Sequence, residues 1–211
     1  MEPPQSRYAV NERAEVLPHL PAGIGSMLDV GCGSGGFGLG VRRERGPGLR
    51  IVGVEAVADQ AATARGHGYD EVLEGYFPQA LEGRDELFDC LVFNDVLEHM
   101  VDPWEVLRDS RRFLAPGGRA LASLPNVRHV SVVQRLLRGR WDYADEGILD
   151  RTHLRFFTRA TMVQMFAETG WQVESVTGIN PRMDDRGRFD RLAPLVGDLR
   201  FQQFAIVARP S

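Results

Sequence analysis

Short apolar segments alternate with amphipathic segments along most of this chain, and this alternation constrains the fold more than any other feature of the sequence. Two parallel strands cannot be joined by a tight turn and need a long crossover, which is usually a helix. Alternating strand and helix patterns therefore predict an α/β protein built on a parallel sheet. We expect its strands at residues 26–30, 50–55, 71–74, 88–93, 119–123, 171–177 and 201–208.

Two segments interrupt the alternation. One lies at residues 1–22, before the first expected strand, and the other at about 124–157, after the fifth. The chain has 211 residues, of which 43% are hydrophobic, so it can bury the core of one domain. Ligands of open parallel sheets bind beyond the carboxyl ends of the strands. We therefore expect an N-terminal arm or lid at 1–22, and a domain at 23–211 whose insert at about 124–157 covers the substrate.

Two helices carry clear end signals. Asp102 and Glu105 have the spacing of a capping box, and the Pro-Gly-Gly sequence further along predicts that this helix runs to Leu114. A second helix is expected to start at Thr158 and to end at Gly170. Both helices would follow strands, as an α/β sheet requires.

Charge and cysteine content exclude several classes of protein. The formal net charge of -4 gives no general attraction to nucleic-acid phosphates or anionic membranes, so we expect neither as a partner. The acidic, proline-rich residues 1–5 do not resemble a secretion signal, and no apolar run approaches the roughly 20 residues that span a bilayer. Cys32 and Cys90 lie in apolar segments and are expected to be buried free thiols of a cytoplasmic protein.

A glycine-rich turn follows the first expected strand and precedes a helix. Its sequence is Leu28-Asp29-Val30-Gly31-Cys32-Gly33-Ser34-Gly35-Gly36. Glycine allows the tight turn and the close approach of a ligand, while free amides at a helix start suit a carboxylate or phosphate. Glu55 ends the next strand at the spacing expected for a residue that holds a ribose diol. The pattern predicts a ligand that contains a ribose.

The turn resembles the first motif of class I S-adenosylmethionine-dependent methyltransferases, because Asp29 directly precedes its first glycine. The resemblance extends to Gly53-Val54-Glu55, Phe88-Asp89, Asn94-Asp95-Val96-Leu97-Glu98-His99, Leu114-Ala115-Pro116-Gly117-Gly118 and Ser123-Leu124-Pro125-Asn126. It implies a Rossmann-like, doubly wound, seven-stranded and mostly parallel sheet with an antiparallel last strand. It also implies a methyltransferase that uses S-adenosyl-L-methionine and releases S-adenosyl-L-homocysteine.

The same resemblance implies a cofactor site. Gly31 and Gly33 would approach the methionine part, Glu55 would hold the ribose hydroxyls, and an aromatic residue would flank the adenine. An aromatic residue of the N-terminal arm would close over the cofactor. The implied residues are Tyr8, Asp29, Gly31, Cys32, Gly33, Glu55, Ala56, Tyr76, Phe77, Asn94, Asp95 and Val96.

Methyl transfer from a sulfonium requires a nucleophile in line with the methyl group and a route for its proton. His99 is the first candidate for the base, because the loop after the fourth strand opens toward the cofactor and imidazole accepts protons near neutral pH. His153 is the second, in a charged and aromatic loop at residues 147–157. Trp141 and Tyr143 would form an aromatic wall for the acceptor.

A metal site is an alternative use of the same residues. Asp95, Glu98 and His99 would share one face if their segment were helical, and His153 could add a fourth ligand. This set resembles the one in ubiquinone-pathway O-methyltransferases and small-RNA 2'-O-methyltransferases. Methyltransferases without a metal also carry a Glu-His pair, so the sequence alone assigns no metal.

The acceptor is expected to be a small molecule. The segment after the fourth strand lacks the Asn/Asp-Pro-Pro-aromatic motif of amino-methylating nucleic-acid and glutamine enzymes, and residues 150–158 resemble bacterial methyltransferases of polysaccharide assembly and specialised metabolism. We expect methylation of a hydroxyl or carboxyl oxygen on a small molecule or sugar. One alternative is an amine oriented by Asp145, Glu146 and Asp150, and another is a partner protein that binds the cofactor without turnover. The oligomeric state has no signature in the sequence.

Overall fold

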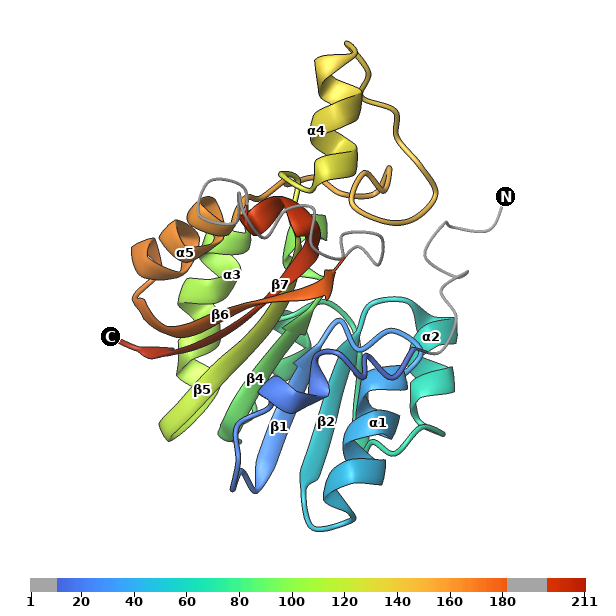
Figure 1. Cartoon of the computed structure of the whole chain (residues 1–211). Coiled ribbons are helices and arrows are strands. Elements are labelled where there is room, and N and C mark those ends of the chain that lie inside the picture. Colours follow the sequence, from blue (N-terminus) through green and yellow to red (C-terminus); the bar gives the residue numbers. More distant parts are fainter. Residues whose placement is uncertain (1–10, 182–196) are drawn as a thin grey trace.

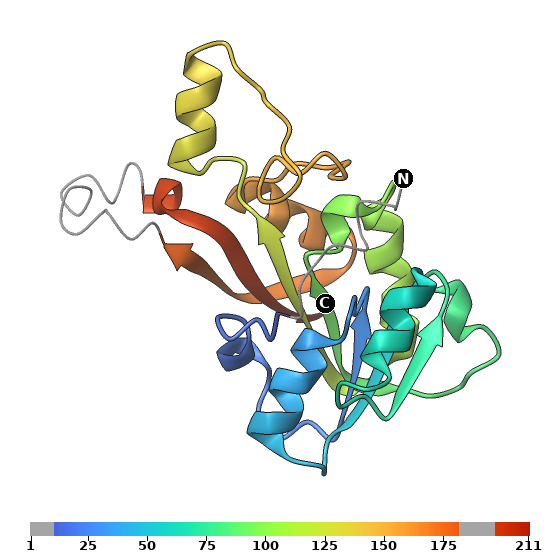
Figure 2. The same cartoon turned by 90° about the vertical axis from the view of Figure 1, so that its right-hand side faces the viewer.

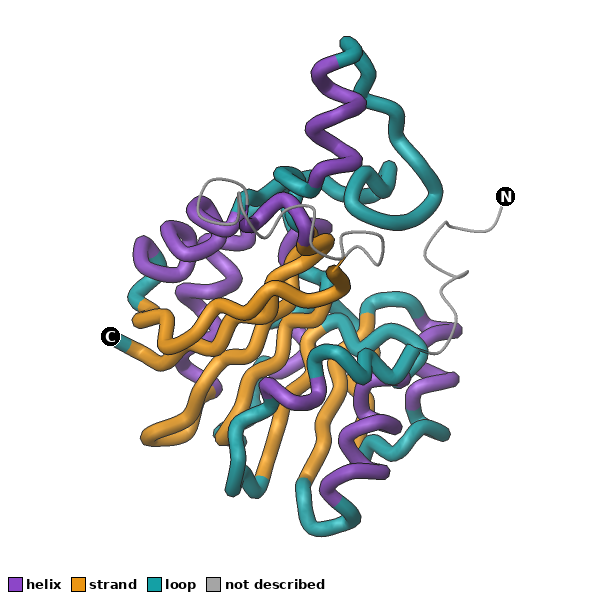
Figure 3. Tube along the Cα trace, in the orientation of Figure 1, coloured by secondary structure: helices purple, strands orange, loops and turns teal. Residues whose placement is uncertain are grey.

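The computed structural model describes residues 11–181 and 197–211. Its centre is a seven-stranded sheet with the strand order β3-β2-β1-β4-β5-β7-β6 (Figures 1 and 3). All pairs from β3 to β5 are parallel, and β7 is antiparallel to both of its neighbours. The expected fold class, including the antiparallel last strand, is confirmed. The strands are β1 (Ser26–Val30), β2 (Arg50–Glu55), β3 (Glu71–Glu74), β4 (Phe88–Asn94), β5 (Leu114–Pro125), β6 (Trp171–Pro181) and β7 (Phe201–Pro210).

Helices cover both faces of the sheet, so the strands are apolar on both sides. Side chains of β4 alternate between two core clusters, with Leu91 and Phe93 on one face and Cys90 and Val92 on the other. The first face packs against α3 (Pro103–Ser110) and α5 (Arg159–Glu168), and the second against α1 (Gly36–Arg45) and α2 (Ala58–Ala64). None of the described helices is long and apolar enough to cross a membrane.

The helix starts agree with the sequence, but one helix end does not. Asp102 caps α3 by accepting a hydrogen bond from the Glu105 amide at 2.9 Å. The α-helix ends at Ser110, earlier than the expected Leu114, because a 3-10 turn η5 (Arg111–Phe113) leads directly into β5. Thr158 and Thr161 form a capping box at the start of α5.

The two segments that interrupt the alternation pack in different ways. The arm residues Val16, Leu17 and Leu20 pack into the α1 face of the core, around a 3-10 turn η2 (Leu17–His19). After β5 the chain forms α4 (Val130–Leu137), which stands away from the sheet in both views, and then a long loop that returns toward the sheet (Figures 1 and 2). The loop brings residues 147–157 to the ends of β4 and β5.

Candidate active site

The glycine turn connects β1 to α1. Gly31, Gly33 and Gly35 have φ values of 71°, 54° and 85°, a left-handed conformation that glycine adopts at low cost. The amides of Gly31 and Cys32 donate to the carbonyl of Val54 at 2.8 and 3.1 Å, which holds the turn against β2. A Cβ atom at position 31 would lie 2.5 Å from Val96 Cγ2. A larger residue is therefore excluded there by both the backbone and the close packing of Val96.

Glu55 lies beside the turn, at the end of β2. It is 8% exposed, and its two carboxylate oxygens accept the Gly33 and Val57 amides, each at 2.8 Å. These bonds fix the carboxylate between the glycine turn and the start of α2, and each oxygen keeps a lone pair for a further donor. Ala56 is exposed next to it. The position suits a ribose diol.

Asp29 and Cys32 are buried under the turn. One oxygen of Asp29 accepts a hydrogen bond from the Tyr69 hydroxyl at 2.5 Å, and the other has no hydrogen-bond partner among the described residues. Burial raises the pKa of the Asp29 carboxyl to about 7. Burial also raises the pKa of the Cys32 thiol far above its usual range, so Cys32 is a neutral packing residue and no nucleophile. Both cysteines are free and buried, as expected.

The raised pKa of Asp29 predicts how its removal changes stability. In the unfolded chain this carboxyl loses its proton near pH 4, whereas in the folded protein it keeps the proton up to about pH 7. The protonated Asp29 carboxyl therefore contributes stability at low pH, and this contribution is lost as the pH rises to about 7. Asp29→Asn should therefore raise the free energy of unfolding at pH 8, by on the order of 1–4 kcal/mol, and by less at pH 5. Urea unfolding of the cofactor-free proteins measures this, and an equal difference at the two pH values would contradict it.

The two candidates for the adenine contact lie in different environments. Tyr76 is 75% exposed and free to meet a ligand. Phe77 is buried in the core, with its ring edge-on to Phe93 and Phe113 at centroid distances of 6.3 and 5.6 Å. Core packing thus occupies the ring of Phe77, and of the two alternatives Tyr76 is the side chain exposed to a ligand. Tyr8 lies outside the described residues.

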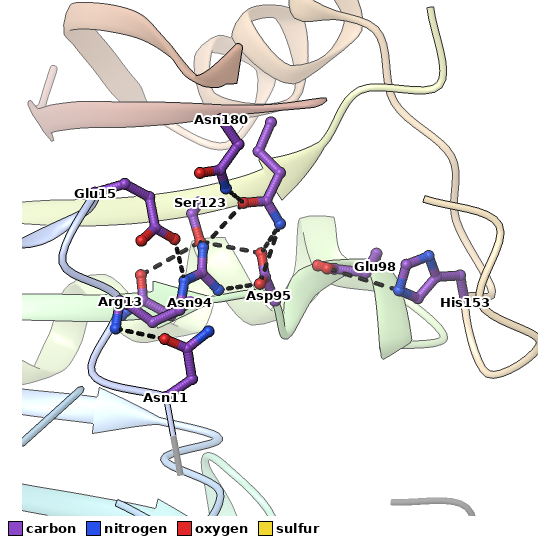
Figure 4. A network of polar contacts seen from close by, with 10 residues as sticks. Asn11, Arg13, Glu15, Asn94, Asp95, Glu98, Ser123, His153 and Asn180 are labelled. Atoms are coloured by element: carbon purple, nitrogen blue, oxygen red, sulfur yellow. Dashed lines mark hydrogen bonds and ion pairs between the residues drawn. The ribbon is translucent and has the colours of Figure 1, made fainter. Parts of the chain in front are cut away.

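Asp95 departs most from the sequence expectation. The segment is not a regular helix: Asp95 has φ of 47°, and only a short 3-10 turn, η4 (Leu97–His99), follows. Its carboxylate forms an ion pair with Arg13 of the arm and accepts hydrogen bonds from Gln203 and Ser123, each at 3.1 Å (Figure 4). Asp95 thus binds the arm to the sheet, and the group of possible metal ligands contains Glu98, His99 and His153 but not Asp95.

Arg13 is a site residue that the sequence reasoning missed. Its guanidinium, with a side chain 11% exposed, also donates to Ser123 at 3.2 Å and to Gln203 at 3.1 Å. Burial alone would lower the pKa of this group, but Asp95 and Glu15 raise it above its ordinary value. A single arginine in an irregular arm gives no local signal, since its partners come from β5, β7 and the end of β4. Asn94, at that end, contacts Ser123 at 3.4 Å.

Glu98, His99 and His153 form a compact cluster. Figure 4 shows two of its members, Glu98 and His153, beside this network. The rings of His99 and His153 have centroids 4.7 Å apart, and His153 Nε2 lies 3.9 Å from Glu98 Oε1. The loop is fixed there because Leu154 and Arg155 donate their amides to the Glu98 carbonyl at 2.8 and 3.0 Å. The structure therefore brings the two candidate histidines together from segments far apart in the chain.

Burial controls the charges in this cluster. Glu98 is 1% exposed, and neither of its carboxylate oxygens has a hydrogen-bond partner among the described residues. Burial raises the pKa of Glu98 well above its usual range, while burial and the neighbouring His153 lower the pKa of His99. A carboxyl group without a partner is costly to bury. The Glu98 carboxyl and the imidazoles of His99 and His153 form a donor set that fits a divalent cation, with one ligand atom from each residue and all of them within 4.8 Å of one another.

A cavity opens next to the cluster. It has a volume of about 600 Å³ and is lined by Tyr143, Arg151, His153, Leu154 and Phe156. Tyr143 is half exposed, whereas Trp141 packs edge-on against Phe156 at 5.2 Å and is not part of the lining. Of the two aromatic residues expected to contact the acceptor, Tyr143 lines this cavity, together with Phe156, and Trp141 contacts Phe156.

Comparison with known proteins agrees with this geometry. Residues 5–176, more than half of the chain, match the protein family described as "Methyltransferase domain". The chain is a class I S-adenosylmethionine-dependent methyltransferase. S-adenosylmethionine is its cofactor, and the expected enzyme class is confirmed.

The relatives of this methyltransferase include O-methyltransferases. The ubiquinone biosynthesis O-methyltransferase of Aliivibrio fischeri (strain MJ11) is 26% identical over 171 residues, which are 75% of this chain and 69% of that protein. The fold matches a possible histamine N-methyltransferase of Thermotoga maritima with a TM-score of 0.66, at 16% identity over 98% of this chain and 91% of that one. It also matches a methyltransferase of calicheamicin biosynthesis in its S-adenosylhomocysteine-bound form, with a TM-score of 0.59, at 22% identity over 93% and 52%.

Proposed function

We propose that this methyltransferase transfers the methyl group to a hydroxyl oxygen of a small molecule or sugar, at the cavity beside His99 and His153. The observation that carries the proposal is the buried cluster of Glu98, His99 and His153 at the edge of that cavity. A hydroxyl group must lose a proton when it is methylated, whereas a carboxylate or a neutral amine needs little help from a base. The cluster provides that help. The O-methyltransferases among the relatives support the same chemistry.

The amine alternative has less support. It needs acidic side chains that are free to face a cationic acceptor. Asp150 is 2% exposed and accepts hydrogen bonds from the amide and hydroxyl of Thr152, at 2.8 and 2.7 Å. Asp145 is paired with Arg151 at 2.8 Å. Asp150 therefore holds the shape of the loop, whereas Asp145 and Glu146 lie on its exposed side.

Different residues of the chain would hold the cofactor, align the acceptor and take its proton. When bound, S-adenosylmethionine supplies an electrophilic methyl group on its sulfonium. Glu55 would hold the ribose, while Tyr143 and Phe156 would align the acceptor oxygen in line with that methyl group. His99 would take the proton from the acceptor oxygen at Nε2, because its Nδ1 contacts the Thr152 carbonyl and hydroxyl at 3.3 and 3.1 Å. A pKa below the usual value keeps the imidazole of His99 neutral and ready to accept that proton.

The buried Glu98 favours a second form of this proposal. In this form Glu98, His99 and His153 would hold a divalent cation, which would lower the pKa of an acceptor hydroxyl. Both forms place the acceptor oxygen at the same cluster.

We expect the chelator-treated protein to bind about one Mn²⁺ or Zn²⁺ per chain, because the cation would give the buried Glu98 carboxylate a partner that it lacks among the described residues. Isothermal titration calorimetry measures this binding, and Glu98→Gln should abolish it. The matched control is Glu74→Gln, an exposed glutamate away from the cluster, which should bind the ion as the wild type does. No binding to the wild-type protein, together with turnover that persists in EDTA, would leave His99 as a base without a metal.

A screen with matched acceptors tests the class of nucleophile. We would measure S-adenosylhomocysteine formation with phenol, benzoate, aniline and their dihydroxylated relatives, and with methyl glycosides for sugars. The proposal predicts turnover on the hydroxyl acceptors. Turnover on the amine alone would replace it with N-methylation, whereas tight cofactor binding without turnover on any class of acceptor would favour a non-catalytic binding protein.

A further inference from the structure

A buried tyrosine contacts the acid of the cofactor turn. Tyr69 precedes β3 and is 8% exposed. Its hydroxyl donates to Asp29 Oδ2 at 2.5 Å and accepts the amide of Gly38 at 3.1 Å. The Gly38 amide belongs to the first turn of α1, where amides have no partner within the helix. Tyr69 therefore joins the end of β1 to the start of α1 beneath the cofactor turn.

The surrounding backbone is shaped around this ring. A Cβ atom at Gly38 would lie 2.2 Å from Tyr69 Cε2, and one at Gly53 would lie 3.0 Å from Tyr69 Cδ1. The next residue, Asp70, exchanges hydrogen bonds with Ile51: its amide donates to the Ile51 carbonyl at 2.8 Å, and its carboxylate accepts the Ile51 amide at 2.7 Å. The ring thus packs closely against the backbone of α1 and β2, and hydrogen bonds of the next residue fix its own segment.

One carboxylate oxygen of Asp29 is left for a hydrogen-bond donor outside the described residues. Oδ2 is held by Tyr69, while Oδ1 is buried and has no hydrogen-bond partner among the described residues. The other charged or titratable groups that act on this carboxylate are Glu55 and Arg13, and Cys32 lies on the same turn. The cofactor carries an α-ammonium group on its methionine part, close to where the glycine turn would hold it. A cationic donor is the partner that a buried carboxylate oxygen needs.

We propose that Tyr69 is a positioning residue of the cofactor site: it holds Asp29 by Oδ2 so that Oδ1 accepts a hydrogen bond from the α-ammonium group of the cofactor. Tyr69 touches no part of the cofactor in this arrangement and acts only through Asp29. The inference depends on the cofactor and not on the acceptor, so it stands or falls independently of the proposed O-methylation.

Two ligands that differ in the amino-acid part test the proposal. S-adenosylhomocysteine carries the ammonium group, and 5'-methylthioadenosine lacks it but keeps the adenosine and the sulfur. Calorimetry of Tyr69→Phe should show about tenfold weaker binding of S-adenosylhomocysteine, as for the loss of support to one charged hydrogen bond, and less than a twofold change for 5'-methylthioadenosine. Equal losses for the two ligands would show that Tyr69 only supports the fold, and the proposal would be wrong.

The pH dependence gives a readout that a structural role would not change. The hydrogen bond from Tyr69 lowers the pKa of Asp29 from the value that burial alone would give. In Tyr69→Phe, the loss of S-adenosylhomocysteine affinity on acidification should therefore begin at a higher pH than in the wild type. A midpoint that stays in place would overturn the proposal.

Asp29→Asn covers the case in which Tyr69→Phe does not fold. It keeps the tyrosine and the shape of the side chain but removes the charge. This variant should lose most of the preference for S-adenosylhomocysteine over 5'-methylthioadenosine, and adding Tyr69→Phe to it should reduce the preference no further. If Asp29→Asn kept the full preference for S-adenosylhomocysteine over 5'-methylthioadenosine, the Asp29 carboxylate would not recognise the ammonium group. Tyr69, which acts through Asp29, would then have no role in this recognition.

Discussion

His99→Ala is expected to lower the turnover of a hydroxyl acceptor by about 100-fold or more, the usual range for loss of a catalytic base. His99 lies beside His153, which lines the cavity. Turnover should therefore fall whether His99 accepts the proton or binds a cation. The cofactor contacts lie on the glycine turn and Glu55, so affinity for S-adenosylhomocysteine should change by less than about twofold. Turnover and calorimetry on the same preparation measure the two effects.

The control for this variant is His19→Ala, a partly buried histidine in the arm that lies outside the cluster. It should retain wild-type turnover. A full rate in His99→Ala would exclude His99 from the chemistry. An equal loss in His19→Ala would mean that any histidine substitution disturbs the enzyme, and the assignment would fail for that reason.

Glu55→Ala is expected to weaken binding of S-adenosylhomocysteine by about 100-fold, which corresponds to about 3 kcal/mol. The variant removes the expected acceptor of the ribose hydroxyls. It also releases the amides of Gly33 and Val57, so the glycine turn loses one of its fixed points. Glu55→Gln keeps an acceptor oxygen and should fall between the wild type and Glu55→Ala. Calorimetry with S-adenosylhomocysteine measures the series.

The control is Glu74→Ala. Glu74 is paired with Glu55 in the register of β2 and β3 but is exposed, so it reports the effect of losing a negative charge nearby. Its affinity should stay within about twofold of the wild type, because an exposed charge contributes little. Unchanged affinity in Glu55→Ala would show that the ribose is held elsewhere.

The sheet was predictable because its strands follow simple rules. β1, β2 and β3 have the expected bounds, since each is a short apolar run between clear turn signals. β5 begins earlier than expected, at Leu114, because it pairs with β4 on both sides of the Pro-Gly-Gly sequence: Phe88 pairs with Leu114 and Cys90 with Arg119. An irregular register of this kind has no signature in local sequence.

The site was predictable only in part. The glycine turn and Glu55 depend on local spacing, so the sequence places them correctly beside each other. The environment of Asp95 could not be predicted, because it depends on a left-handed backbone and on Arg13, which is 82 residues away in the chain. The burial of Phe77 follows from Phe93 and Phe113 in the same way. Partners distant in sequence thus determine the surroundings of both Asp95 and Phe77.

A crystal structure of the protein with S-adenosylhomocysteine would test directly whether methyl transfer takes place at the cluster of Glu98, His99 and His153, because it locates the sulfur atom relative to these residues. We expect ribose hydroxyls at Glu55, the amino-acid part beside the glycine turn, and the sulfur facing the cavity that Tyr143 and His153 line. A complex whose sulfur points away from that cavity, or whose ribose does not contact Glu55, would contradict this expectation.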